Sequence, residues 1–142
     1  VHAYVIDSGI RATHTEFIGR IGNGQDFVND GQGTNDCDGH GTHVAGTIGG
    51  TTYGVAKNVI LHPLRIFNCQ GVSSGSGSIA AIDWIINNRV QNAPGVVNMS
   101  LGSGYSSSYN NAVVNAITQT GFTFVVSAGN DNNDACDKSP AS

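Results

Sequence analysis

Hydrophobic residues recur along the chain with two different spacings, one typical of strands and one typical of helices. The opening segment VHAYVID sets Val1, Ala3 and Val5 on one face and stops at an Asp-Ser-Gly turn, which is typical of a strand. Residues 76–90 place apolar side chains at helical spacing, namely Ile79, Ile82, Ile85, Ile86 and Val90, with Trp84 beside them. A second helical stripe follows a serine run able to cap it and is closed by Gly121; its members are Tyr109, Ala112, Val113, Ala116 and Ile117.

Shorter segments fit between these elements. We expect a short strand at 25–28 within a long polar loop, a closely packed helix at 40–49, and strands at 58–67, 95–102 and 122–126. Pro63 lies inside one of these predicted strands, although proline has no N–H for a ladder and is normally confined to edges or bulges. The pattern gives no reason for its position.

Strands that alternate with helices predict an α/β fold, a doubly wound and mostly parallel sheet with helices on both faces. No repeat or linker interrupts residues 1–142, so we expect one domain. In such sheets, ligands bind at the carboxyl ends of the strands. Asp7, residues 100–102 and residues 127–130 all follow predicted strands, so they should meet at one edge, together with His40 if its helix starts there.

Composition narrows the classes of partner. A net charge of -4 with 11% charged residues leaves no basic patch for nucleic acid and no polybasic segment for lipid, so we expect neither partner. No apolar run approaches the length of a membrane span, and residues 1–20 lack a signal-peptide pattern. Three cysteines are an odd number, so in an oxidising compartment at least one stays free or pairs outside this chain.

The segment HGTHVAGTIGG, residues 40–50, places glycine on both sides of its first histidine. His40 and His43 share a helix face at this spacing, so a metal pair, a catalytic base with a neighbour, and two packed histidines all remain open. Together with Asp7 and Asn130, His40 suits acyl transfer, which needs a base for the nucleophile, a carboxylate for the base and a donor for the oxyanion. These residues leave the nucleophile unassigned.

Several motifs together resemble those of the subtilases, a family of serine proteases. YVIDSGI resembles their aspartate motif, HGTHVAGT their histidine motif and SAGN their oxyanion segment, in family order. YGVAKNV and NMSLGSGYSSS are also similar to the family, and the whole run most resembles the secreted proteinase K and aqualysin-like branch. The resemblance covers nearly the whole chain and implies a subtilisin-like fold.

The resemblance also implies a role for each candidate. Asp7 would orient His40, which would take the proton of a serine and later protonate the leaving amine, while the Asn130 amide would donate to the oxyanion. Such a donor contributes about 10²–10³ in rate, a magnitude known from a subtilase. The GTSMA-type serine motif of the family does not occur here, and three serines near the predicted edge do not match it: Ser8, Ser100 and Ser127.

We therefore expect residues 1–142 to be the N-terminal and middle part of one subtilase catalytic domain, incomplete at both ends, with the nucleophile outside this chain. Alone, such a piece would be inactive and marginally folded. The expected function is that of a secreted, monomeric serine endopeptidase that acts on polypeptides and is made with a propeptide. The alternatives are a pseudoprotease that keeps the peptide groove, and a metal hydrolase that binds zinc through His40 and His43 with Asp36 or Asp38.

Eight residues match the substrate-binding positions of the subtilases. They fall into two backbone edges that would flank a peptide and one wall of a specificity pocket. They are Gly71, Val72 and Ser73 on one side, Ser100, Leu101 and Gly102 on the other, and Ala128 and Gly129 at the first specificity pocket. A peptide would add to these edges as a strand. Ser73 stands where many relatives have glycine, which predicts a less permissive edge.

The resemblance further implies a Cys37–Cys69 disulfide and a partner for Cys136 beyond Ser142. The chemistry needs no cofactor. Some relatives bind structural calcium in the loop that here carries Asp26, Asp30, Asn35 and Asp36, and hard oxygen ligands fit that ion. We nevertheless interpret these residues as solvated loop acids, so no metal ligands are assigned.

Overall fold

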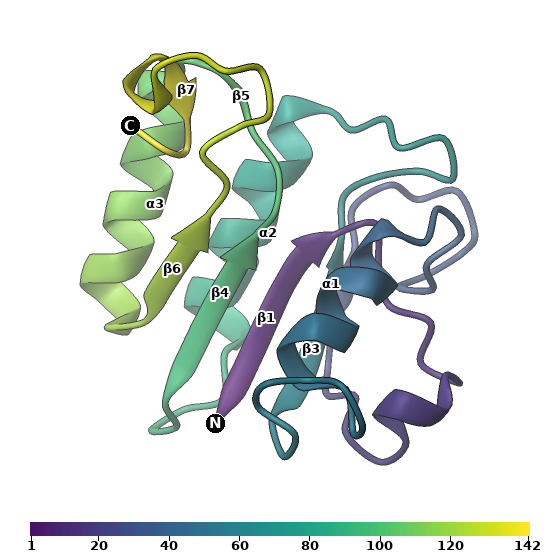
Figure 1. The fold of residues 1–142 in the computed structure, drawn as a ribbon. Helices are drawn as coiled ribbons and strands as arrows, with labels where there is room; N and C mark the ends of the chain where they lie inside the picture. Colours follow the sequence, from purple (N-terminus) through teal and green to yellow (C-terminus); the bar gives the residue numbers. More distant parts are fainter.

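Five parallel strands form the central sheet of the computed structural model, which describes residues 1–142 (Figure 1). The strand order is β2-β3-β1-β4-β6, and every adjacent pair is parallel. The strands are β1 (His2–Asp7), β2 (Gln25–Asp26), β3 (Ile60–Arg65), β4 (Gly95–Met99) and β6 (Thr123–Val126). The predicted α/β class and the parallel sheet are thereby confirmed.

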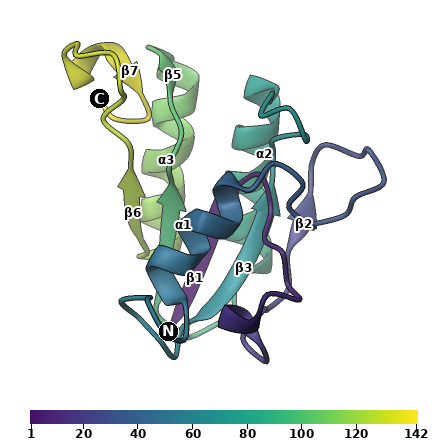
Figure 2. The same cartoon turned by 45° about the vertical axis from the view of Figure 1, so that its right-hand side comes forward.

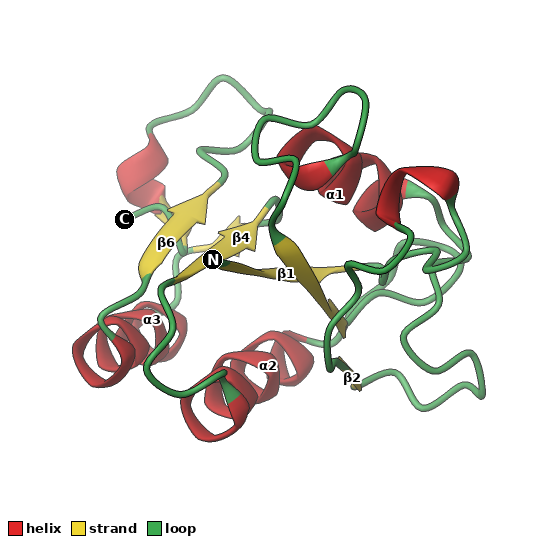
Figure 3. Cartoon of the chain, turned by 90° about the horizontal axis from the view of Figure 1, so that it is seen from below, coloured by secondary structure: helices red, strands yellow, loops and turns green.

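Helices cover both faces of this sheet, as predicted. Helix α1 (His40–Gly49) lies on one face, whereas α2 (Gly75–Asn88) and α3 (Ser107–Thr120) lie on the other (Figure 3). Four short elements were not predicted: the 3-10 helices η1 (Thr15–Phe17) and η2 (Ala135–Asp137), and the antiparallel pair β5 (Ser103–Gly104) and β7 (Lys138–Ser139). Strands of two residues are too short to show a period.

The hydrophobic core is divided between the two faces of the sheet. The larger cluster joins α2 and α3 to the sheet, and its fully buried members include Ala81, Ile82, Ile85, Val97 and Met99. The smaller cluster packs Ala45 of α1 against Ala3, Val5 and Leu61. Two residues of the predicted stripes do not face the core, because Ile117 of α3 is 42% exposed and Val90 is 37% exposed.

The ends of α3 follow the sequence signals. Ser106 is the N-cap residue, and its hydroxyl accepts a hydrogen bond from the Tyr109 N–H at 3.4 Å. Gly121 ends the helix in the left-handed region, at a φ of 69°. The predicted helix at 76–90 is shorter than expected, since α2 ends at Asn88 and the Val90 N–H donates to the Tyr4 hydroxyl instead.

Pro63 occupies a place in β3 where no ladder bond is lost. The N–H of Leu61 donates to the Arg20 carbonyl on the outer side of β3, and the nitrogen of Pro63, two residues on, faces that same side. Strand β2 pairs there only with Leu64 and Arg65. Proline is tolerated inside this strand because the ladder on that side is interrupted at Pro63, between the Ile21–Leu61 bridge and β2.

His62 is a buried histidine on β3, away from the carboxyl ends of the strands. It is 1% exposed and stacks on Tyr4, with ring centroids 4.4 Å apart. Its Nδ1 donates to the Asn23 carbonyl at 2.8 Å, so its Nε2 is the acceptor in the 2.8 Å contact with His2 Nδ1. Both ring nitrogens are thus used by the neutral form.

This arrangement predicts a loss of stability in acid. Burial lowers the pKa of His62 below its ordinary value of 6.5, so the unfolded chain binds a proton that the folded chain resists. The stabilisation is present above that value and is lost as the pH falls toward the pKa of the folded state. We expect denaturant unfolding at about pH 7.5 and about pH 5 to show a smaller acid loss in His62→Gln than in the unchanged protein. An equal loss in both proteins would contradict this assignment, and His14→Gln, at an exposed position, is the control.

The predicted disulfide joins Cys37 to Cys69, and Cys136 is free and exposed. The bond ties the loop that follows β2, which projects from the sheet edge in Figure 2, to the turn after β3. None of the helices has the length and apolar character needed to cross a bilayer.

Removal of this bond should destabilise the fold. The cysteines are 32 residues apart, and a closed loop of that length stabilises by about 3–4 kcal/mol through the entropy of the unfolded chain. We expect the double variant Cys37→Ser/Cys69→Ser to lose that much free energy of unfolding in denaturant titrations. Cys136→Ser, which breaks no bond, should leave it unchanged; equal losses in the two variants would contradict the interpretation.

Candidate active site

Three strands deliver their carboxyl ends to one edge of the sheet (Figure 1). Strand β1 ends at Asp7, β4 ends at Met99 directly before Ser100, and β6 ends at Val126, after which residues 127–130 follow. Helix α1 begins at His40 beside the end of β1. The parallel sheet thereby gathers segments that are far apart in the sequence, as the strand pattern predicts.

Asp7 and His40 are in direct contact. Asp7 Oδ1 lies 2.8 Å from His40 Nδ1, and it also accepts the Ser8 N–H at 2.7 Å. A carboxylate only accepts, so Nδ1 carries the proton and Nε2 is left as a free acceptor. The Asp7 side chain is fully buried, whereas that of His40 is 55% exposed. A buried carboxylate thus holds an accessible imidazole in one tautomer.

The electrostatics of the pair favour a protonated imidazole. The hydrogen bond from the Asp7 carboxylate raises the pKa of His40 above its ordinary value, and burial offsets part of this effect. Burial raises the pKa of Asp7, while the hydrogen bonds from His40 and Ser8 act in the opposite direction. Oδ2 of Asp7 is buried without a hydrogen-bond partner. An imidazole in this position can accept a proton and have its charge stabilised, as a general base requires.

A cavity of about 310 Å³ opens beside the pair and is lined by Asp7, His40, Gly71 and residues 100–102, among others. A second cavity, lined in part by Ser73, shares Leu101 and Gly102 with the first. Residues from both predicted substrate edges therefore line two neighbouring cavities that meet at Leu101 and Gly102. Val72 and Ala128 line neither of these cavities.

Asn130 lies at an adjoining cavity rather than in contact with the pair. That cavity includes Asn130 and Gly129, and it shares Ser100, Leu101 and Gly102 with the cavity of Asp7 and His40. The predicted oxyanion segment thus lies on the same side of the molecule as the Asp–His pair, with the end of β4 between them.

The loop acids considered for calcium have protein partners instead. Asp30 forms a bidentate pair with the buried Arg65 guanidinium at 2.6 and 2.8 Å, and Asp26 contacts the same group at 3.3 Å. The Arg65 hydrogen bonds lower the pKa of Asp30 to about 2. Asp36 is bonded to the first turn of α1. A guanidinium among these carboxylates does not fit a cation site, and no group of three or more His, Cys, Asp or Glu side chains is arranged to hold a metal ion.

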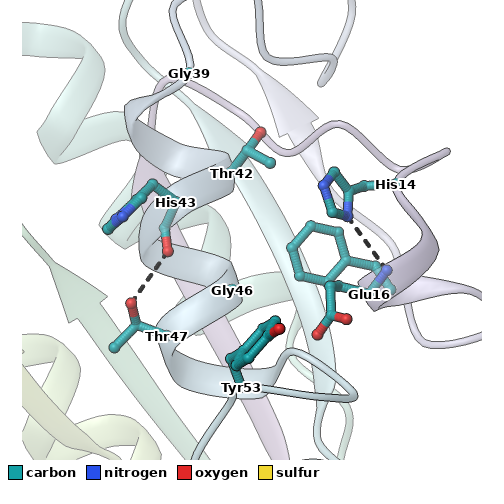
Figure 4. A pocket seen from close by; sticks show the side chains of 9 residues that line it. His14, Glu16, Gly39, Thr42, His43, Gly46, Thr47 and Tyr53 are labelled. Atoms are coloured by element: carbon teal, nitrogen blue, oxygen red, sulfur yellow. Dashed lines mark hydrogen bonds between the residues drawn. The ribbon is translucent and has the colours of Figure 1, made fainter.

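A larger cavity of about 510 Å³ lies on another flank of α1 (Figure 4). His14, Glu16 and Tyr53 contribute to its lining, together with residues of α1 that include His43. The ring of His43 points away from His14 in this view, and neither member of the Asp–His pair lines the cavity. The histidine pair considered as a zinc site is therefore split, since His40 faces Asp7 at a different cavity.

These features define an α/β domain with a hydrolase-type Asp–His pair at the carboxyl edge of a parallel sheet. Residues 4–142 match a family model described as Subtilase family. The extracellular serine proteinase of Thermus sp. (strain Rt41A) is 59% identical over 141 residues, which are 99% of this chain and 34% of that protein. The alkaline serine exoprotease A of Vibrio alginolyticus is 52% identical over 141 residues, 99% of this chain and 26% of that protein.

A solved structure extends the likeness to three dimensions. A crystal structure of a cold adapted subtilisin-like serine proteinase matches with a TM-score of 0.92 at 49% identity, covering 98% of this chain and 50% of that one. The chain belongs to the subtilase family, in its proteinase K branch. The family and the subtilisin-like fold expected from the motifs are thus confirmed. The chain spans no more than half of the length of these three relatives.

Proposed function

We propose that the protein is a serine endopeptidase of the subtilase type, and that residues 1–142 are part of its one catalytic domain. The observation that carries the proposal is the 2.8 Å contact between Asp7 and His40, with the imidazole Nε2 free beside a solvent-open cavity. This is the arrangement that a general base needs. The family membership of the chain supports the same reaction.

In this mechanism, a serine outside residues 1–142 attacks the peptide carbonyl carbon while His40 Nε2 takes its hydroxyl proton. Asp7 stabilises the resulting imidazolium, and the side-chain amide of Asn130 donates to the oxyanion. His40 then gives the proton to the leaving amine, which breaks the C–N bond and leaves an acyl-enzyme. Water, activated by the same base, releases the acid and restores the serine.

Polypeptides are the proposed substrates. An extended chain would lie between residues 71–73 and residues 100–102. Gly71 lines one of two neighbouring cavities and Ser73 the other, and Leu101 and Gly102 line both. Ala128 and Gly129 are the proposed wall of the first specificity pocket. We further propose a secreted monomer made with a propeptide. The Cys37–Cys69 disulfide and the likeness to the extracellular proteinase of Thermus support secretion, and the family resemblance supports the propeptide.

Hydrolysis of casein and of a peptide p-nitroanilide by the full-length gene product tests this proposal. We expect hydrolysis that a serine-directed sulfonyl fluoride abolishes and that o-phenanthroline, a zinc chelator, leaves intact. Loss of activity with the chelator alone would support a metal hydrolase instead. Peptide binding without hydrolysis would support the pseudoprotease alternative.

A further inference from the structure

Asp36 is a buried carboxylate with an unusual number of donors. It lies in the loop before α1, is 8% exposed, and accepts five hydrogen bonds. Oδ1 receives the Ser8 hydroxyl at 2.9 Å, the Asp38 N–H at 3.0 Å and the Gly39 N–H at 2.8 Å, and Oδ2 receives the Thr42 N–H at 2.9 Å and the Thr42 hydroxyl at 2.5 Å. Four of these five donors belong to residues 38–42, around the start of α1.

Ser8 connects this carboxylate to the turn after β1. Its hydroxyl donates to Asp36 and accepts the Gly41 N–H at 2.8 Å, while its own N–H donates to Asp7 Oδ1. The backbones also touch, since a Cβ atom on Gly41 would lie 2.2 Å from the Gly9 carbonyl oxygen. Ser8 therefore contacts Asp7 on one side and the first turn of α1 on the other.

The first turn of α1 needs such support because its own sequence supplies little. Gly39, the N-cap residue, has a φ of 111° and no side chain to cap the helix, and Gly41 follows directly after His40. The His40 side chain is largely exposed, so few packing contacts fix it. The place of the ring relative to Asp7 thus depends on the backbone of this turn.

We propose that Asp36 is a positioning residue of the active site: through Ser8 and Thr42 it locks the first turn of α1 against the end of β1 and so fixes the Asp7–His40 contact. This rests on the proposed function for its effect on catalysis. Asp36 touches neither the substrate nor the reacting atoms. Its role is to hold the base where the nucleophile and the leaving group can both reach it.

Asp36→Asn in the full-length gene product tests the proposal. An amide presents one acceptor oxygen, so its NH₂ group faces either the donors of Thr42 or those of Ser8 and Gly39, and the turn loosens. Misplacement of a catalytic group by about 1 Å costs about 100-fold, so we expect kcat to fall about 10-fold to 100-fold with KM changed less than about twofold. The pKa of His40, read from its ring proton shifts by NMR, should fall toward its ordinary value.

Three further variants, at Asp38 and Thr42, serve as controls for Asp36→Asn. Asp38→Asn removes a charge close to His40, while its amide oxygen can still accept the His40 N–H and its backbone N–H still donates to Asp36. It therefore measures the electrostatic part of the change in the His40 pKa. Thr42→Val removes one donor from Asp36, whereas Thr42→Ser retains it; we expect kcat to fall in the first and to be largely kept in the second. If Asp36→Asn does not fold, the comparison of Thr42→Val with Thr42→Ser still tests the positioning role of Asp36.

The outcomes separate this proposal from the proposed function. A His40 pKa that falls no further in Asp36→Asn than in Asp38→Asn, or equal kcat values in Thr42→Val and Thr42→Ser, would overturn the positioning role. A change in KM alone would also overturn it. If the unchanged protein hydrolyses no peptide, the proposed function fails, while the NMR comparison still decides whether Asp36 fixes the Asp7–His40 contact.

Discussion

His40→Ala should abolish peptide hydrolysis, with kcat reduced about 10⁶-fold, the magnitude that loss of the histidine produces in a subtilase. The imidazole is the only group at the cavity whose free nitrogen can take a proton while its other nitrogen rests on a buried carboxylate. Without it, the serine hydroxyl keeps its proton and the leaving amine receives none. Steady-state kinetics on a peptide p-nitroanilide measure the effect.

His43→Ala is the matched control for this variant. His43 lies one turn further along α1 and lines a different cavity, so its loss should leave kcat nearly unchanged. Thermal unfolding of both variants shows whether α1 remains folded. Similar losses in His40→Ala and His43→Ala would contradict the assignment of the base.

Asp7→Asn should reduce kcat about 10⁴-fold while the backbone stays in place. The amide is of nearly the same size, but it carries no negative charge, so it cannot stabilise the imidazolium that forms when His40 takes the serine proton. The Ser8 N–H can still donate to the amide oxygen, so the turn after β1 keeps its hydrogen bond. The loss should fall on kcat rather than on KM, because Asp7 acts through His40.

The dependence of activity on pH provides a second test of Asp7→Asn. Asp7 raises the pKa of His40 in the unchanged protein, and the base works only when neutral, so activity should fall as the pH drops through a value above 6.5. Removal of the carboxylate lowers that pKa, and the acid limb should move to lower pH. An acid limb that stays in place in Asp7→Asn would show that His40 is not the titrating base.

The helices could be predicted from their helical period, and the central strands from short, mostly apolar runs. Strands β1 and β3 are buried on both faces by α1, α2 and α3, so apolar residues occupy nearly every position. The strand ends then place Asp7 and residues 100–102 at one edge without knowledge of any contact. Pairs such as β5 and β7 are held by tertiary context, and two residues carry no period.

The site could be predicted only in part. Asp7, His40 and Asn130 follow from the family motifs, which report which residues react but not what holds them. Asp36 carries no such signal, since an aspartate in a Gly- and Asp-rich loop fits calcium binding or solvation equally well. Its burial against Ser8 and Thr42 arises from contacts between segments that are distant in sequence, and these appear only once β1 and α1 are packed together.

Pro63 and Arg65 of β3 are two further residues whose surroundings could not be predicted from the local sequence. The strand pattern marks both as buried, but it cannot show that the ladder beside Pro63 is interrupted between the Ile21–Leu61 bridge and β2. Nor can it show that Arg65 pairs with the loop acids Asp26 and Asp30. Which acid neutralises a buried cation depends on the path of a long polar loop. Such paths follow from tertiary contacts rather than from local sequence.

The most direct test of the catalytic pair is to treat the full-length gene product with a peptidyl chloromethyl ketone and to locate the label by peptide mapping with mass spectrometry. The nitrogen of a catalytic histidine displaces chloride from a bound inhibitor and forms a stable N–CH₂ bond. We predict one label per molecule, on His40, with hydrolysis lost in proportion to labelling. A protein that loses hydrolysis with the label on any other residue, or that continues to hydrolyse peptide with His40 fully alkylated, would contradict the account.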